Sequence, residues 1–230
     1  MISAVNGYKP SHRKAVSMTD RPSLDELQAI NALQRDYFNR NVDLFEPPLP
    51  EGVPQRLRRI IRAGAIRAGE SVLDVGTGTG ILIPFIMEFA PSEIHVCDLA
   101  EKMLTRVKDK FPHVITHLCD VGDMDLPEDS LDVVFINGCF SNIVDKAKSL
   151  HRLYRLLRPK GRLIISHPLG REFIVKLKKH APFPLELLPD EIEARNLLQK
   201  HGFRMAHYLD EPAFYLVQAE SNKRLPHNNK

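Results

Sequence analysis

The chain has 230 residues, of which 43% are hydrophobic and 27% are charged, so it can bury one sizeable core. Its formal net charge of +3 is spread over 32 basic and 29 acidic side chains, which indicates neither a dedicated nucleic-acid surface nor a membrane surface. Three cysteines without a CxxC pair argue against a disulfide scaffold or a zinc module and indicate a reducing compartment, so we expect a cytoplasmic protein without a bound metal.

Residues 1–22 are expected to form a disordered tail. The segment 1–19 carries Lys9, Arg13 and Lys14 and no acid, which is also typical of an organelle transit peptide, and this alternative stays open. The longest apolar run, at 81–87, is far shorter than the roughly 20 residues that span a bilayer, so we expect no membrane span.

Residues 23–40 are predicted to form an amphipathic helix, because apolar side chains recur there at spacings of three and four residues. A proline-rich loop follows. The region carries three aromatic residues, Tyr37, Phe38 and Phe45. We interpret residues 23–52 as a helical lid that excludes water from a site beneath it. A helix packed on the sheet edge is the alternative.

A second helix is predicted over residues 53–65, with apolar side chains on one side. The other side carries four arginines, Arg56, Arg58, Arg59 and Arg62. Helical periodicity already accounts for their placement, so a solvated helix face is favoured over a nucleic-acid patch.

From residue 71 onward, short apolar runs alternate with helical stretches, as in a parallel sheet built from βαβ units. Strands are expected at 71–75, 93–98, 114–120, 131–137, 161–167, 204–210 and 213–220, and helices at 79–90, 100–110, 145–157 and 189–203. The pattern predicts an α/β fold: a Rossmann-like doubly wound sheet, mostly parallel with an antiparallel C-terminal strand, and helices on both faces. Residues 53–220 form one domain in this interpretation, followed by a disordered tail at 221–230.

The segment VLDVGTGTG at 72–80 ends the first predicted strand in three alternate glycines. Ligands of open parallel sheets bind at the carboxyl ends of the strands, and glycine lets a ligand approach the backbone closely. The dinucleotide pattern GxGxxG would need glycine at Ile81, so a nucleotide-dependent oxidoreductase is disfavoured. A tight turn without a ligand is the simpler alternative.

Three acids lie at the ends of predicted strands near this turn. Asp98 can accept two hydrogen bonds from the hydroxyls of a ribose, Asp120 can accept from an adenine amino group, and Asp74 adds negative charge. A pyrophosphate would be repelled by three carboxylates, so the predicted ligand is a nucleoside that carries positive charge.

The sequence resembles class I S-adenosylmethionine-dependent methyltransferases, in particular the type 11 group that includes quinone-ring methyltransferases. Three segments carry the resemblance: VLDVGTGTG at 72–80, VCDLAEKML at 96–104, and LPEDSLDVVFIN at 126–137 with SLHRLYRLLRPKGRLIIS at 149–166. The resemblance implies S-adenosylmethionine as cofactor. The implied cofactor-binding residues are Asp74, Gly76, Thr77 and Gly78 around the methionine part, Asp98 and Leu99 at the ribose, Asp120 and Val121 at the adenine, and Met103 and Asn137.

Two departures from the family pattern matter. The loop after Asp120 is longer than usual, so Asp123 competes with Asp120 for the adenine. The segment NGCFSN at 137–142 lacks the Asn-Pro-Pro-Tyr pattern of enzymes that methylate amino groups of bases and glutamines, which disfavours nucleic-acid targets.

The resemblance implies methyl transfer to a small-molecule acceptor with an aromatic or quinone-like ring. An RNA-modifying methyltransferase and a non-catalytic S-adenosylmethionine-binding partner protein remain alternatives. His167 ends the predicted strand at 161–167, close to where the acceptor must lie, and is the candidate catalytic base. In the simpler alternative it only shapes the following loop.

Other reactive side chains are assigned no chemistry. Cys97 and Cys119 directly precede acids of the predicted site, so strand alternation should turn them to the opposite face as core residues, and Cys139 is also expected in the core. The basic cluster Lys176, Lys178, Lys179 and His180 is predicted to be a solvated helix face rather than an anion-binding patch.

Overall fold

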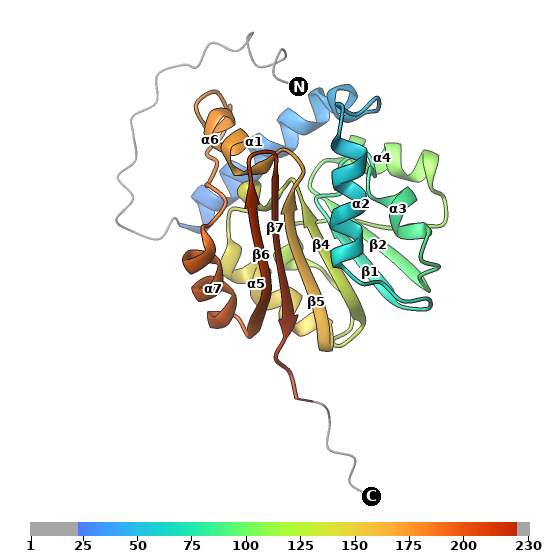
Figure 1. The fold of residues 1–230 in the computed structure, drawn as a ribbon. Coiled ribbons are helices and arrows are strands. Elements are labelled where there is room, and N and C mark those ends of the chain that lie inside the picture. Colours follow the sequence, from blue (N-terminus) through green and yellow to red (C-terminus); the bar gives the residue numbers. More distant parts are fainter. Residues whose placement is uncertain (1–22, 225–230) are drawn as a thin grey trace, which may run out of the picture.

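The computed structural model describes residues 23–224 and contains one seven-stranded sheet within that range. The strands are β1 (Ser71–Val75), β2 (Glu93–Asp98), β3 (Ile115–Leu118), β4 (Leu131–Asn137), β5 (Leu157–His167), β6 (Phe203–Glu211) and β7 (Phe214–Ser221). Their order is β3-β2-β1-β4-β5-β7-β6, and β7 alone runs antiparallel to its neighbours (Figure 1). The chain order reverses between β1 and β4, which is the switch point where open α/β sheets bind ligands.

Helices cover both faces of the sheet (Figure 1). They are α1 (Leu24–Arg40), α2 (Val53–Ala63), α3 (Ile83–Met87), α4 (Glu101–Lys110), α5 (Lys146–Leu156), α6 (Gly170–Lys178) and α7 (Glu191–Lys200). Alternation along β1 separates the two cores: Val72 packs with α2 and α3, whereas Leu73 packs with α5, α6 and α7. The predicted Rossmann-like fold is therefore confirmed.

Three expected elements have different bounds. The helix expected at 79–90 is only α3, because Gly78 and Gly80 take positive φ and delay its start. The strand expected at 114–120 pairs only over β3, whereas β5 begins at Leu157, four residues before its expected start. Helix α6 was expected only as the solvated helix face that carries Lys176 and Lys178, without bounds; it begins three residues after the end of β5.

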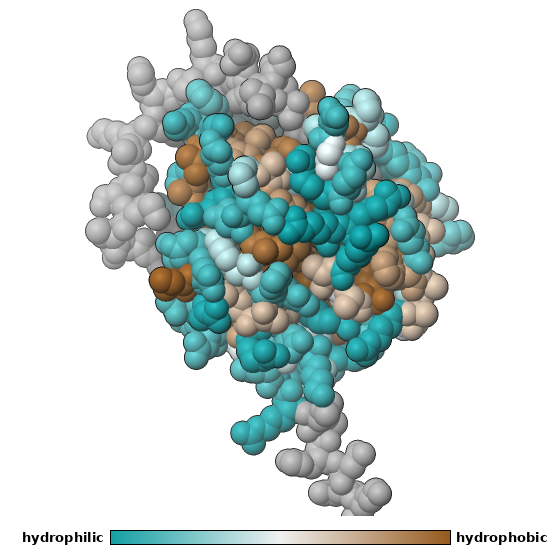
Figure 2. All heavy atoms as spheres, viewed as in Figure 1, coloured by the Kyte–Doolittle hydropathy of each residue, from teal (hydrophilic) through white to brown (hydrophobic). Residues whose placement is uncertain are grey.

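The exposed side of α2 carries arginines that contact the rest of the fold. Arg59 is paired with Glu211 at 2.7 Å and lies 4.2 Å from the centroid of the Phe214 ring, and Arg58 lies over the Phe85 ring. Figure 2 shows hydrophilic side chains over this helix, as the solvated-face interpretation expects.

The two expected disordered tails lie largely outside the described residues, although Ser221 belongs to β7 and not to a tail. Among residues 23–224, no helix is both long enough and apolar enough to cross a membrane.

Candidate active site

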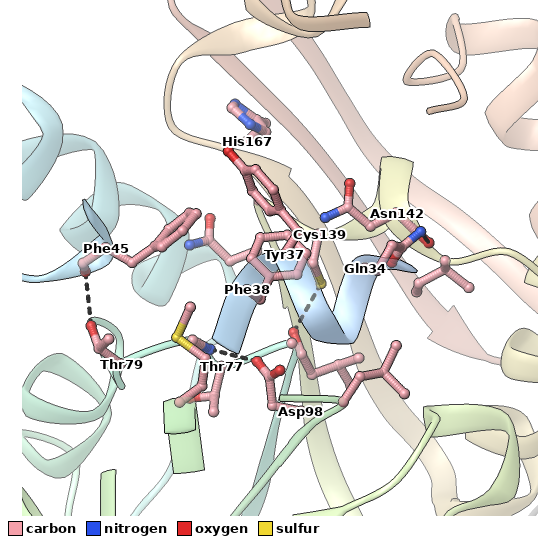
Figure 3. Close-up of a pocket in the computed structure, with 18 of the residues that line it drawn as sticks. Gln34, Tyr37, Phe38, Phe45, Thr77, Thr79, Asp98, Cys139, Asn142 and His167 are labelled. Carbon is pink, nitrogen blue, oxygen red and sulfur yellow. Dashed lines mark hydrogen bonds between the residues drawn. The ribbon is translucent and has the colours of Figure 1, made fainter. Parts of the chain in front are cut away.

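A cavity of about 290 Å³ lies at the carboxyl edge of the sheet (Figure 3). All the predicted site residues line it: Asp74, Gly76, Thr77, Gly78, Asp98, Leu99, Met103, Asp120, Val121, Asn137 and His167. Apart from Met103 on α4, they come from the ends of five strands and the segments that follow, so parallel pairing gathers side chains that are up to 93 positions apart (74 to 167).

Of the three glycines in the turn after β1, Gly76 and Gly80 are packed against other side chains and Gly78 is open. Gly76 has φ +61°, and a Cβ there would lie 2.6 Å from the Cys139 sulfur. Gly78 has φ +56°, and a Cβ there would have no atom within 4 Å. Both positions favour glycine conformationally, but only Gly78 leaves its backbone open to a ligand.

Asp98 anchors this turn to the end of β2. Its Oδ2 accepts from the Gly78 N–H at 3.0 Å and its Oδ1 accepts from the Ala100 N–H at 2.9 Å. Burial raises the pKa of the Asp98 carboxyl, and these backbone hydrogen bonds oppose the shift. The carboxylate is thus held in one orientation and retains lone pairs for a ligand hydroxyl.

Asp74 is the most deeply buried acid of the site. The Thr77 hydroxyl donates to its Oδ2 at 2.7 Å. Burial raises the pKa of Asp74 to about 7, an effect that the charge of Asp98 reinforces and the Thr77 hydrogen bond opposes. Its charge therefore changes within the physiological pH range.

The structure separates the two acids that compete for the adenine role. Asp120 lines the cavity and accepts from the Gly122 N–H and the Asn31 amide, both at 2.8 Å. Asp123 does not line the cavity and is paired with Lys148, with 62% of its side chain exposed. Of the two, only Asp120 is placed to contact a ligand.

The cysteines pack in the core as expected, but they also border the cavity, which sequence reasoning missed. Cys97, Cys119 and Cys139 all line the cavity, and Cys139 donates to the Val75 carbonyl at 3.0 Å. Cys97 also belongs to the main core cluster, and the other two pack against it. A cavity over strand ends is bordered by side chains from both faces of the sheet, so alternation did not turn these thiols away from it.

His167 lies at the end of β5 and is 6% exposed. Its Nδ1 accepts from the Leu169 N–H at 3.2 Å, and its ring stacks on Phe173 with centroids 5.3 Å apart. Burial lowers the pKa of His167 to about 4. Apolar side chains from the segment after β5 line the same cavity: Phe173, Ile174, Leu177, Phe183 and Leu185.

Helix α1 covers the cavity through polar contacts that sequence reasoning missed. The Asn31 amide donates to Asp120, and the buried Gln34 donates to the Asn142 carbonyl at 2.9 Å. Asn39 donates to Glu101 on α4 at 2.7 Å. The only signal in the sequence was a few amides on an amphipathic helix, and their partners are 62 to 108 residues away.

Aromatic side chains complete the cover. Phe38 lies within 5.8 Å of the rings of Tyr37, Phe45 and Phe183, measured between centroids. The Thr79 hydroxyl donates to the Phe45 carbonyl at 2.8 Å, which ties this segment to the glycine turn (Figure 3). Within residues 23–224, no cluster of three or more His, Cys, Asp or Glu side chains is arranged to hold a metal ion.

Comparison with known proteins agrees with this geometry. Residues 73–165 match the model of the type 11 methyltransferase-domain family. One similar protein is the ubiquinone/menaquinone biosynthesis C-methyltransferase UbiE of Vibrio campbellii, with 30% identity over 132 residues, which cover 54% of this chain and 51% of that protein. Another is the uncharacterized methyltransferase C25B8.09 of Schizosaccharomyces pombe, with 28% identity over 56% of this chain and 51% of that protein. The chain thus spans about half the length of these relatives.

Solved structures share the fold. Burkholderia thailandensis 1,6-didemethyltoxoflavin-N1-methyltransferase, solved with 1,6-didemethyltoxoflavin and S-adenosylhomocysteine, aligns with a TM-score of 0.70 at 21% identity over 89% of this chain and 94% of that one. The putative methyltransferase in a Haloferax volcanii complex with the Trm112 activator aligns with a TM-score of 0.66 at 15% identity over 86% of this chain and 100% of the matched chain.

The fold is that of class I S-adenosylmethionine-dependent methyltransferases. It is defined by the order of the strands, by the cavity at the switch point of the sheet and by the glycine turn that borders this cavity. More particularly, residues 73–165 match the type 11 methyltransferase-domain family, the group that the sequence resembles.

Proposed function

We propose that this protein transfers a methyl group from S-adenosylmethionine to a small-molecule acceptor with an aromatic or quinone-like ring. The observation that carries this proposal is the division of one cavity into two parts. Acids and open backbone lie at the ends of β1, β2 and β3, whereas apolar and aromatic side chains lie beyond β4 and β5. Asp98 lies at the end of β2 in the acidic part, and His167 lies at the end of β5 in the apolar part. These two strands are three positions apart in the sheet, so the two parts are separated by about 14 Å at the usual strand spacing.

The acidic part fits the cofactor. Gly78 has an open backbone, and Asp98 and Asp120 present carboxylates to the cavity, where they would hold the ribose and the adenine. Asp74 would face the positively charged methionine part, with Thr77, Met103 and Asn137 around it. When bound, S-adenosylmethionine supplies an electrophilic methyl group on a sulfonium centre.

The protein's contribution would be orientation and exclusion of water. Asn137 is held by the Ser166 hydroxyl at 3.0 Å, and α1 with Phe38 and Phe45 closes the cavity from above, which supports the lid interpretation of residues 23–52. Displacement at a methyl group needs aligned reactants more than covalent help, so a dry and rigid site suits it.

The acceptor class is supported by the apolar part of the cavity, since flat rings bind well between aromatic and aliphatic side chains. The names of the similar proteins, a quinone-biosynthesis C-methyltransferase and a methyltransferase that acts on the ring compound 1,6-didemethyltoxoflavin, point to the same class. Three free cysteines also support our proposal of a reducing, cytoplasmic location.

The test is transfer of a labelled methyl group to a panel of hydroxylated aromatic rings, quinols, phosphoethanolamine and transfer RNA. Product on a ring compound alone, formed at limiting S-adenosylmethionine at least about tenfold more slowly in Asp98→Ala but at the wild-type rate in the exposed control Asp109→Ala, supports the proposal. Product on RNA alone would favour the RNA-modifying alternative. Tight cofactor binding without transfer to any member would favour a non-catalytic binding protein.

A further inference from the structure

The hydrogen bond between Leu169 and His167 determines where the imidazole carries its proton. The Leu169 backbone N–H donates to Nδ1 at 3.2 Å, and a ring nitrogen that accepts a hydrogen bond is unprotonated. The neutral ring therefore carries its proton on Nε2. The position is rigid, because His167 pairs with Tyr215 on β7 at the end of a long strand.

The Nε2 atom is the ring nitrogen of His167 that stays free to meet a ligand in the cavity. His167 lines the cavity and is 6% exposed, and within residues 23–224 no side chain or backbone group hydrogen-bonds its Nε2. Phe173 stacks on one side of the ring. Nε2 is not among the fully buried atoms that lack a partner, so it keeps accessible surface and this donor can reach a ligand atom that accepts.

A general base needs the opposite arrangement, a free lone pair at the nitrogen that faces the acceptor. Here the lone pair is already engaged by Leu169, and burial also disfavours the charged ring that a base would become. The geometry thus does not favour the base role that we expected from the sequence.

The geometry points to His167 as a hydrogen-bond donor that positions the acceptor through a carbonyl, phenol or phenolate oxygen on its ring. This inference rests on the proposed function and narrows its substrate class to ring compounds that bear such an oxygen. Tyr37 on α1 projects toward His167 in Figure 3, so the ring of the acceptor would lie between the lid and the end of β5. Removal of a proton is not part of this role.

The tautomer can be observed directly in the wild-type protein. Long-range ¹H–¹⁵N NMR spectra of ¹⁵N-labelled protein at pH 7, with His167→Gln used to assign the ring, should show a protonated Nε2 and an unprotonated Nδ1. The reverse pattern, or a doubly protonated ring, would overturn the inference. This measurement does not depend on how well a variant folds.

Binding of two probes then tests the donor. With S-adenosylhomocysteine present, wild-type protein should bind 1-naphthol about tenfold tighter than naphthalene. That ratio should fall at least fivefold in His167→Leu and stay within about twofold in His167→Gln, whose amide keeps a donor, and in the exposed control His151→Leu.

Failure of the proposed function and failure of the donor role of His167 give different results. Wild-type protein that does not bind S-adenosylhomocysteine by calorimetry contradicts the proposed function itself. Protein that binds S-adenosylhomocysteine but shows an unchanged probe ratio in His167→Leu, or binds neither probe, overturns the donor role alone.

Discussion

At the residue scale, Asp98 has two tasks. It orders the glycine turn through the Gly78 N–H and presents its remaining lone pairs to the cavity. Replacement by alanine removes a charge-assisted acceptor, so we expect S-adenosylmethionine affinity to fall tenfold or more, about 1.5 to 3 kcal/mol, measured by calorimetry. Asp109→Ala on the exposed side of α4 is the control, and equal affinity in a folded Asp98→Ala would contradict the assignment.

Asp74 should make cofactor binding depend on pH. Burial raises its pKa to about 7, so below pH 7 the carboxyl is mostly protonated and must lose its proton to attract a cation. We expect S-adenosylmethionine affinity to rise between about pH 6 and pH 8, by at most about tenfold per unit, and then to level off. Asp74→Asn should remove this rise, and an identical profile in the variant would show that another group causes it.

The raised pKa of Asp74 also makes the folding stability depend on pH. The pKa of Asp74 is raised above its unfolded value of 3.8, so its contribution to stability is full below that value and is lost as pH rises through about 7. Without ligand, the free energy of unfolding of wild-type protein should therefore fall more between pH 5 and pH 8 than that of Asp74→Asn. Urea unfolding at both pH values measures the difference, and parallel losses would argue against a protonated Asp74.

At the element scale, the glycine turn allows a matched comparison. Gly76 and Gly78 have similar positive φ, so alanine is similarly strained at both, but only at Gly76 does the new Cβ meet Cys139. We expect Gly76→Ala to lower the free energy of unfolding by about 1 to 3 kcal/mol more than Gly78→Ala does. Gly78→Ala should instead weaken cofactor binding, because its Cβ would occupy open space that we assign to the cofactor. Equal effects of the two variants on both quantities would contradict this division.

Helix α1 is joined to the site through Asn31 and Asp120, the acid to which we assign the adenine. We expect hydrogen exchange in residues 24–45 to slow when S-adenosylhomocysteine binds, because the ligand adds contacts beneath the helix. Asn31→Ala should weaken this protection, whereas Asn196→Ala on the remote helix α7 should not. Exchange that is the same with and without ligand would favour a helix that merely packs on the sheet edge.

At the scale of the whole molecule, the cavity is lined by segments that run from α1 to the loop after α6. Its lining residues come from the lid, the glycine turn, β5 and α6. A bound cofactor should therefore stabilise the whole folded domain. At a concentration of 100 times Kd, S-adenosylhomocysteine should add about 2.7 kcal/mol and raise Tm by about 5 to 10 °C. The same concentration should shift Asp98→Ala clearly less. An unchanged Tm in wild-type protein would argue against binding at this cavity.

The sequence alone determined the order and type of most elements. Strands and helices follow from hydrophobic period, and parallel βαβ pairing then places Asp74, Asp98 and His167 at one edge of the sheet. Because these signals are local, the glycine turn and the acids at strand ends could be recognised from the order of residues along the chain.

Tertiary structure decided the features that depend on distant partners. Asp120 rather than Asp123 borders the cavity because Asn31 holds the first and Lys148 the second. The cysteines border the same cavity because it lies over strand ends, where both faces of the sheet meet. The tautomer of His167 is determined by how the loop after β5 folds back on the ring, a matter of hydrogen-bond geometry that no periodicity encodes.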